Sequence, residues 1–94
     1  VKLQNVKTGE ITSLACDGVF VSIGRKPTTA FLDSAVELDE NGYIIADETT
    51  KTNVPGVYVV GDVRQKALRQ VVTAVADGAV AVHFAEEFLT ENFK

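Results

Sequence analysis

Residues 56–62, Gly-Val-Tyr-Val-Val-Gly-Asp, constrain the fold of this chain more than any other stretch. Residues 57–60 predict a short strand, and because every position is apolar we expect a parallel strand that is buried on both faces. Asp62 follows Gly61 at the carboxyl end of that strand, where ligands bind in open α/β sheets. An ionised carboxylate at this place suits a sugar or polyol hydroxyl, because it accepts strong hydrogen bonds from O–H donors.

A long helix is predicted over residues 68–93. Its apolar residues recur on one face, made of Val71, Val75, Val82, Ala85 and Leu89. The first turn of a helix leaves backbone N–H groups unpaired, and Ser, Thr, Asp or Asn usually caps them. Between Val63 and Gln70 the chain offers none of these residues. Water, the amide of Gln65 or the electron-rich edge of a ligand can take their place; on the local pattern alone, the first two are favoured.

The first part of the chain predicts a hairpin and a third strand. Residues 1–6 and 10–15 alternate between apolar and polar around Gly9, which is typical of a β-hairpin. Residues 19–23 are more apolar and predict another strand. The basic loop 25–28 contains Pro27, which cannot donate to a sheet, so this loop is the candidate domain junction.

Two further turns are predicted between this loop and the central strand. Thr28 or Thr29 is placed to cap a helical turn through residues 30–32. Asn-Gly at residues 41–42 is the strongest short hairpin signal and predicts a second hairpin. Residues 47–53 are polar and rich in threonine, so we expect a loop.

Composition excludes several classes of function. The chain has 94 residues, a net charge of −4 and 46% hydrophobic residues, which indicates one small domain and argues against nucleic acid or an anionic membrane as partner. No transmembrane segment and no signal peptide are predicted. The start at Val1 suggests that these residues continue from something upstream. The one cysteine, Cys16, excludes an internal disulfide and favours a cytoplasmic setting.

Several motifs together carry a resemblance to a known family. They are Pro-Gly-Val-Tyr-Val-Val-Gly-Asp-Val-Arg at 55–64, Leu-Arg-Gln-Val-Val-Thr-Ala at 68–74, Gly-Val-Phe-Val-Ser-Ile-Gly-Arg-Lys-Pro-Thr at 18–28 and Asn-Gly-Tyr-Ile at 41–44. Nearly the whole chain thereby resembles the carboxyl-terminal part of a low-molecular-weight thioredoxin reductase. The resemblance implies an α/β flavoprotein fragment, with residues 1–24 as the tail of an NADPH-binding domain and residues 25–94 as the returning part of an FAD-binding domain.

The resemblance also implies a cofactor site. Asp62, after Gly61, would hold a ribityl hydroxyl of FAD, and the backbone at Gln70 and Val71, after Arg69, would meet the pyrimidine edge of the flavin. A helix N-terminus stabilises negative charge there by roughly 0.3–2 kcal/mol. In the complete enzyme NADPH would be the electron donor and a thioredoxin-like protein the partner.

The chain lacks other parts of that family. It has no Gly-x-Gly-x-x-Gly turn, no Cys-x-x-Cys pair and no predicted metal site or catalytic residue. Cys16 matches no catalytic position, and His83 is predicted to be a surface residue. We therefore expect the chain alone to be inactive, to bind no cofactor tightly, and to associate with itself or form a homodimer.

Other interpretations stay open at this stage. Within the enzymes, the alternatives are the flavoprotein subunit of alkyl hydroperoxide reductase, a ferredoxin-linked thioredoxin reductase and a ferredoxin–NADP reductase. From another class, the chain can be a free-standing α/β binding module with no redox role. The sequence upstream of Val1 would separate these possibilities.

Overall fold

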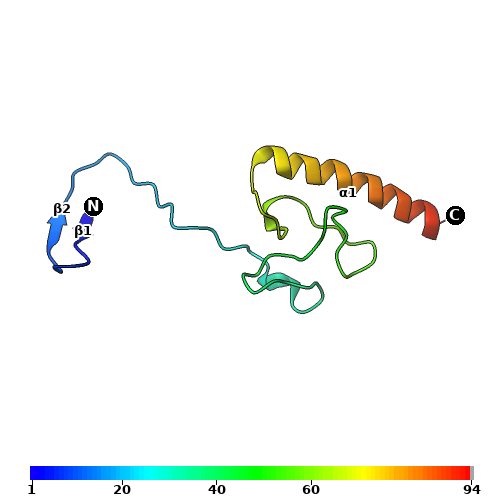
Figure 1. Ribbon diagram of the computed structural model, residues 1–94, viewed down its shortest axis with the longest axis horizontal. Helices are drawn as coiled ribbons and strands as arrows, with labels where there is room; N and C mark the ends of the chain where they lie inside the picture. The colour runs from blue at the N-terminus through cyan, green and yellow to red at the C-terminus, as the bar shows by residue number, and fades with distance from the viewer. Residues whose placement is uncertain (94) are drawn as a thin grey trace.

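The chain folds into a small hairpin and a larger helical part joined by an extended segment, as Figure 1 shows. This computed structural model describes residues 1–93, and its longest dimension is 68 Å. The regular elements are β1 (Lys2–Gln4), β2 (Ile11–Ser13), the 3-10 helices η1 (Ala30–Leu32) and η2 (Gly61–Val63), and the helix α1 (Val71–Asn92). No helix among the described residues is both long and apolar enough to cross a membrane.

The first predicted hairpin is confirmed. β1 and β2 pair antiparallel, with Leu3 opposite Thr12. Gly9 takes a positive φ of 75° in the connecting turn, a conformation that favours glycine. The Asn5 side chain supports the turn by accepting hydrogen bonds from the backbone N–H groups of Lys7 and Thr8 at 2.9 and 3.1 Å.

The predicted third strand, residues 19–23, is not a strand in this structure. The segment is irregular, and Phe20 and Ile23 are 100% and 90% exposed. A strand is stabilised by a neighbour that completes its ladder and covers its apolar face. Within residues 1–93 no strand pairs with residues 19–23. Their β-propensity alone does not form a strand without such a partner.

A small core and the second predicted hairpin organise the larger part. The core consists of the buried side chains of Val36, Ile44 and Val59. The hairpin at Asn41 and Gly42 is confirmed by an antiparallel bridge between Leu38 and Ile44 and by a φ of 85° at Gly42. The backbone of Ile44 also bonds to the end of η2 and to the segment after it, donating to Val63 O at 2.9 Å and accepting from Gln65 N at 2.8 Å. These two hydrogen bonds therefore attach the end of η2 to the core.

The helical turn η1 forms where it was predicted, but it is not capped as predicted. Thr29 occupies the N-cap position and makes no side-chain cap hydrogen bond. Its hydroxyl instead donates to the backbone oxygen of Gly42 at 2.8 Å, in a buried position. A tertiary partner has replaced the local one, and Thr29 joins η1 to the second hairpin.

Residues 57–60 do not form the fully buried parallel strand that their composition predicts. They are joined to a neighbour by one antiparallel bridge, between Tyr58 and Lys51. Val59 is 4% exposed, whereas Val57 and Val60 are 41% and 43% exposed, so Val59 is the one fully buried residue of this segment. No parallel neighbour runs beside this segment among residues 1–93. The α/β fold class itself stands, as the comparisons reported below confirm.

The long helix is confirmed, with its start at Val71 instead of residue 68. It packs on the rest of the chain through the side that carries Asp77, Phe84 and Phe88. The apolar face picked out from the sequence points elsewhere: Val71 and Val82 are 82% and 70% exposed. The helix therefore has two faces with apolar residues, and the chain covers one of them.

Candidate functional site

The turn η2 presents Asp62 at the surface beside a basic side chain. Gly61 opens the turn with a φ of 76°, which lets the extended segment bend sharply. The Asp62 side chain is 45% exposed, and its Oδ2 lies 3.4 Å from Nη1 of Arg25. Because Arg25 is 84% exposed, this ion pair contributes no more than about 1 kcal/mol. A ligand hydroxyl can therefore compete for the carboxylate at little cost.

Arg69 connects this turn to the start of α1. Its Nε donates to the backbone oxygen of Asp62 at 3.0 Å, and its Nη2 donates to the backbone oxygen of Arg64 at 3.4 Å. The guanidinium also lies over the Tyr43 ring, 3.7 Å from the ring centroid. Arg69 thereby holds the turn, the helix start and the second hairpin together.

The first turn of α1 is supported from inside the helix. Gln70 is the N-cap residue, and its backbone N–H donates to Thr73 Oγ1 at 3.0 Å. Thr73 is the third residue of the helix, so it lies outside residues 63–70, in which a cap was expected. A polar residue at that position is the known signal for it. No acidic residue lies in the first turn, so no side-chain charge there competes for the positive end of the helix dipole.

The predicted site residues line two adjoining cavities. One, of about 340 Å³, is lined by Arg25, Tyr43, Asp62 and Arg69 among others. The next, of about 290 Å³, is lined by Arg25, Asp62, Arg69, Gln70 and Val71. The structure thus brings together four of the five predicted residues, and the fifth, Gly61, immediately precedes Asp62 in η2.

A buried ionic cluster behind η2 was missed at the level of the sequence. Asp77, Arg64 and Lys66 have side chains that are 4–7% exposed. The Arg64 hydrogen bond holds the pKa of the Asp77 carboxyl well below its usual range, and the Lys66 and Gly61 donors act in the same direction against burial. An aspartate within a run of Val, Ala and Gly on a helix was the available signal, since a charged residue is almost never fully buried unless it is paired.

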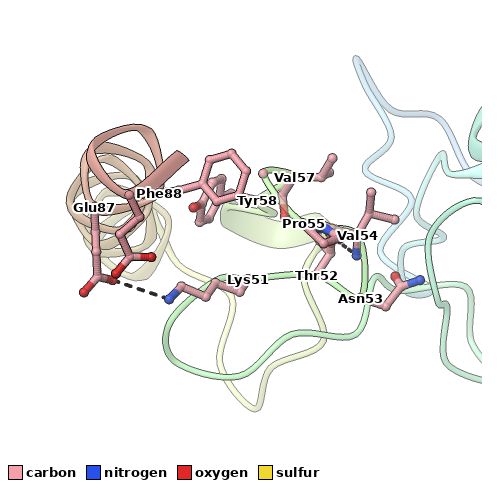
Figure 2. A pocket seen from close by; sticks show the side chains of 11 residues that line it. Lys51, Thr52, Asn53, Val54, Pro55, Val57, Tyr58, Glu87 and Phe88 are labelled. Atoms are coloured by element: carbon pink, nitrogen blue, oxygen red, sulfur yellow. Dashed lines mark hydrogen bonds and ion pairs between the residues drawn. The ribbon is translucent and has the colours of Figure 1, made fainter. Parts of the chain in front are cut away.

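A third cavity lies at the far end of α1, and Figure 2 shows its lining. Its volume is about 220 Å³. Lys51 forms an ion pair with Glu87 at 3.5 Å, and the Tyr58 hydroxyl donates to the backbone oxygen of Phe84 at 2.8 Å. A Cβ at Gly56 would come within 3.0 Å of Phe88. These contacts attach α1 to the loop 51–58, and we assign them a structural role.

Cys16 and His83 do not line any of these three cavities. Cys16 is exposed in the extended segment. His83 is exposed on α1, where its ring meets the edge of Phe84 at a centroid distance of 5.1 Å. Within residues 1–93 no group of His, Cys, Asp and Glu side chains is arranged to hold a metal ion.

Comparison with known proteins establishes the family. The sequence model of the family described as "Pyridine nucleotide-disulphide oxidoreductase" matches residues 1–78. The chain therefore belongs to the pyridine nucleotide-disulphide oxidoreductase family.

Within that family, most of the similar relatives are named thioredoxin reductase. The chain is 49% identical over 89 residues to the thioredoxin reductase of Treponema pallidum, covering 95% of this chain and 29% of that protein. It is 46% identical over 92 residues to the mitochondrial thioredoxin reductase 1 of Arabidopsis thaliana, covering 97% of this chain and 24% of that protein. The resemblance drawn from the motifs is confirmed, and it is favoured over the related flavoproteins and over a non-redox module.

The similarity to thioredoxin reductases extends to their solved structures. The thioredoxin reductase of Lactococcus lactis in its FR conformation superposes with a TM-score of 0.79 at 47% identity, covering 96% of this chain and 30% of that one. That of T. acidophilum superposes with a TM-score of 0.73 at 40% identity, covering 99% and 30%. The chain thus spans less than a third of the length of the relatives that it matches.

Proposed function

We propose that this chain serves as the flavin-proximal, carboxyl-terminal part of an FAD- and NADPH-dependent thioredoxin-disulfide reductase. The observation that carries the proposal is the cavity at which the Gly61–Asp62 turn and the start of α1 meet. The relatives support the class of reaction, because most of the proteins that match nearly all of this chain, among them those of Treponema pallidum and Arabidopsis thaliana, are named thioredoxin reductase.

The residues of the cavity fit a flavin cofactor. Asp62 offers a half-exposed carboxylate, which suits a ribityl hydroxyl. The backbone at Gln70 and Val71 opens a 22-residue helix without an acidic residue in its first turn, which suits the electron-rich pyrimidine edge of the ring. Gly61 and Arg69 would shape the site by holding the turn. When bound, the flavin supplies electron transfer between NADPH and a disulfide.

The proposal includes a division of the chain. Residues 1–24 would be the tail of the NADPH-binding domain and residues 25–94 the returning part of the FAD-binding domain. The exposed segment between the first hairpin and η1 is consistent with such a division. A thioredoxin-like protein would be the partner of the complete, homodimeric enzyme. A cytoplasmic location suits the one cysteine of this chain.

A chimera tests the proposal directly. The chimera is the Lactococcus lactis thioredoxin reductase with its matching segment replaced by residues 1–94 of this chain. We expect it to be purified with FAD bound and to reduce thioredoxin with NADPH. A folded chimera that holds no FAD would contradict the proposal. The unmodified Lactococcus lactis enzyme, prepared in parallel, is the control for cofactor loss during purification.

A further inference from the structure

Asp77 makes an unusual set of contacts for a residue in the middle of a helix. Asp77 is 5% exposed and lies in α1, behind η2. Oδ2 accepts hydrogen bonds from the backbone N–H of Gly61 at 2.9 Å, from Arg64 Nε at 3.1 Å and from Lys66 Nζ. Oδ1 accepts from Arg64 Nη2 at 2.8 Å. One carboxylate therefore gathers a backbone donor and two cations.

Burying a cluster of charges of this kind costs free energy of desolvation. Removing charges from water costs several kcal/mol per ion, and well-packed apolar residues often do as well. Here two buried cations face one buried anion, and the second carboxylate near Arg64, Glu48, has a side chain that is 94% exposed. The cluster therefore depends on Asp77, and its contact with Gly61 is one that an apolar side chain cannot reproduce.

The hydrogen bond between Asp77 and Gly61 lies next to the candidate cofactor site. Gly61 immediately precedes Asp62, and Asp77 lies six residues beyond Val71, about 9 Å along the helix axis. The Asp77–Gly61 hydrogen bond therefore joins the turn that carries Asp62 to α1, and the turn and the start of α1 line the same cavity.

Arg64 extends the same connection to the core. Its Nη1 donates to the backbone oxygen of Asp47 at 3.0 Å, and its backbone follows η2 directly. On the outer side, Arg69 holds the backbone oxygen of Asp62. Asp77 thus holds the turn from behind and Arg69 holds it from the front, so a change at Asp77 removes the contact to Gly61 and leaves the Arg69 contact in place.

We infer that Asp77 is a positioning residue of the cofactor site, which acts through the Gly61 N–H to place Asp62 relative to the start of α1. This inference rests on the proposed function for the identity of the ligand, FAD. The connection between Asp77 and the turn is a property of this chain whether or not FAD is the ligand.

Four variants of the chimera separate positioning from stability. Asp77→Ala removes all the contacts, and Asp77→Asn keeps an oxygen that can accept from Gly61. Tyr58→Phe removes a hydrogen bond between the loop 51–58 and the far end of α1, and Glu48→Gln removes a charge near Arg64 without touching Gly61. The measurements are the FAD dissociation constant by flavin fluorescence, the thermal midpoint, and kcat and KM with thioredoxin.

We expect Asp77→Ala to weaken FAD binding about tenfold or more, as the loss of a hydrogen bond to a charged group does. Asp77→Asn should recover part of the affinity. Tyr58→Phe should lower the thermal midpoint while leaving the FAD dissociation constant within about twofold, since the bond that it removes meets α1 at Phe84, about 10 Å along the helix axis from Asp77. An Asp77→Ala chimera that holds FAD as tightly as the unsubstituted chimera overturns the inference, as does a Tyr58→Phe chimera that loses FAD equally.

A second measurement decides the inference if the chimera itself holds no FAD. Hydrogen exchange of the Gly61 amide is followed by NMR in the 94-residue chain, with and without Asp77→Ala. We expect the substitution to accelerate exchange at Gly61 about tenfold or more, and Tyr58→Phe to leave it nearly unchanged. Equal exchange at Gly61 in the native and Asp77→Ala chains contradicts the inference, whereas the flavin-free chimera contradicts the proposed function alone.

Discussion

Asp62 is the residue whose side chain bears most directly on the proposed function. Its carboxylate lines both cavities and is held in this chain by a weak, exposed ion pair with Arg25. We expect Asp62→Ala in the chimera to weaken FAD retention by about 1.5–3 kcal/mol, the value of a charged hydrogen bond, while the fold persists. Flavin content after dialysis is the measurement. Glu86→Ala, which removes an exposed carboxylate of α1, is the matched control, and equal flavin content in both variants would refute the role of Asp62.

Thr50 combines a strained backbone with an unpaired buried hydroxyl. It is 0% exposed and has a φ of 63°, and its Oγ1 has no hydrogen-bond partner among the described residues. Thr50→Val keeps the shape and removes the unpaired hydroxyl, so we expect it to raise the free energy of unfolding by about 1 kcal/mol. Urea denaturation of the 94-residue chain, followed by helical circular dichroism, measures this.

Thr52 provides the control for that substitution. Its hydroxyl donates to Val57 O at 2.9 Å and accepts from Val54 N at 3.1 Å. Thr52→Val should therefore lower the free energy of unfolding, by about 1 kcal/mol or more. If the substitutions at Thr50 and Thr52 shift the urea midpoint in the same direction, the hydroxyl of Thr50 is paired in solution and the prediction is wrong.

At the scale of elements, the contact between η2 and α1 depends on ionised Asp77. The hydrogen bond from Arg64 is the main cause that holds the pKa of Asp77 below its usual range. A carboxyl group whose pKa is lower in the folded chain stabilises the fold above its unfolded pKa, about 3.9, and loses that contribution as the pH falls further. The docking of α1 on η2 is therefore expected to weaken in acid.

The pH dependence of unfolding tests this expectation. The free energy of unfolding of the 94-residue chain should be insensitive to Asp77 titration from pH 5 to 7 and should fall below about pH 4. Asp77→Asn should be less stable at neutral pH and should lose less stability in acid. Urea midpoints at several pH values, compared between the two proteins, report the difference. Parallel pH profiles would show that Asp77 does not carry this contribution.

At the scale of the whole molecule, the chain leaves much apolar surface uncovered. Phe20 and Ile23 in the extended segment are 100% and 90% exposed, and the outer face of α1 exposes Val71, Val75 and Val82 by 67–82%. The buried core consists of three residues. Contiguous apolar surface favours association, and the unpaired backbone of residues 19–23 can pair with another copy.

We accordingly expect the 94-residue chain by itself to self-associate and to show neither thioredoxin reduction nor tight FAD binding. Sedimentation velocity over a range of concentrations, with a flavin titration alongside, measures both properties. The chimera, in which other segments can cover these faces, serves as the comparison. A strictly monomeric chain that binds FAD tightly would favour a free-standing binding module instead.

Local chemistry was enough to predict the turns and the helix from the sequence. Gly9 and Gly42 adopt positive φ values in the predicted hairpins, and α1 forms within the predicted range. Each of these features is decided by residues a few positions apart, because a tight turn and a helical ladder close their hydrogen bonds within one segment. The motifs at residues 18–28, 41–44, 55–64 and 68–74 together identified the family, and each of them is contiguous in the sequence.

The tertiary structure decided which segments found partners. Residues 19–23 and 57–60 have the composition of strands, yet a strand needs a neighbour from elsewhere in the chain, and neither segment has a ladder within residues 1–93. The same reason explains why the packed side of α1 contains Asp77 and not the valine stripe: Arg64, Lys66 and Gly61 lie where they compensate a buried charge. Strand pairing and the burial of a charge depend on contacts between residues that are distant in the sequence. The periodicity of apolar residues along the sequence therefore does not predict them.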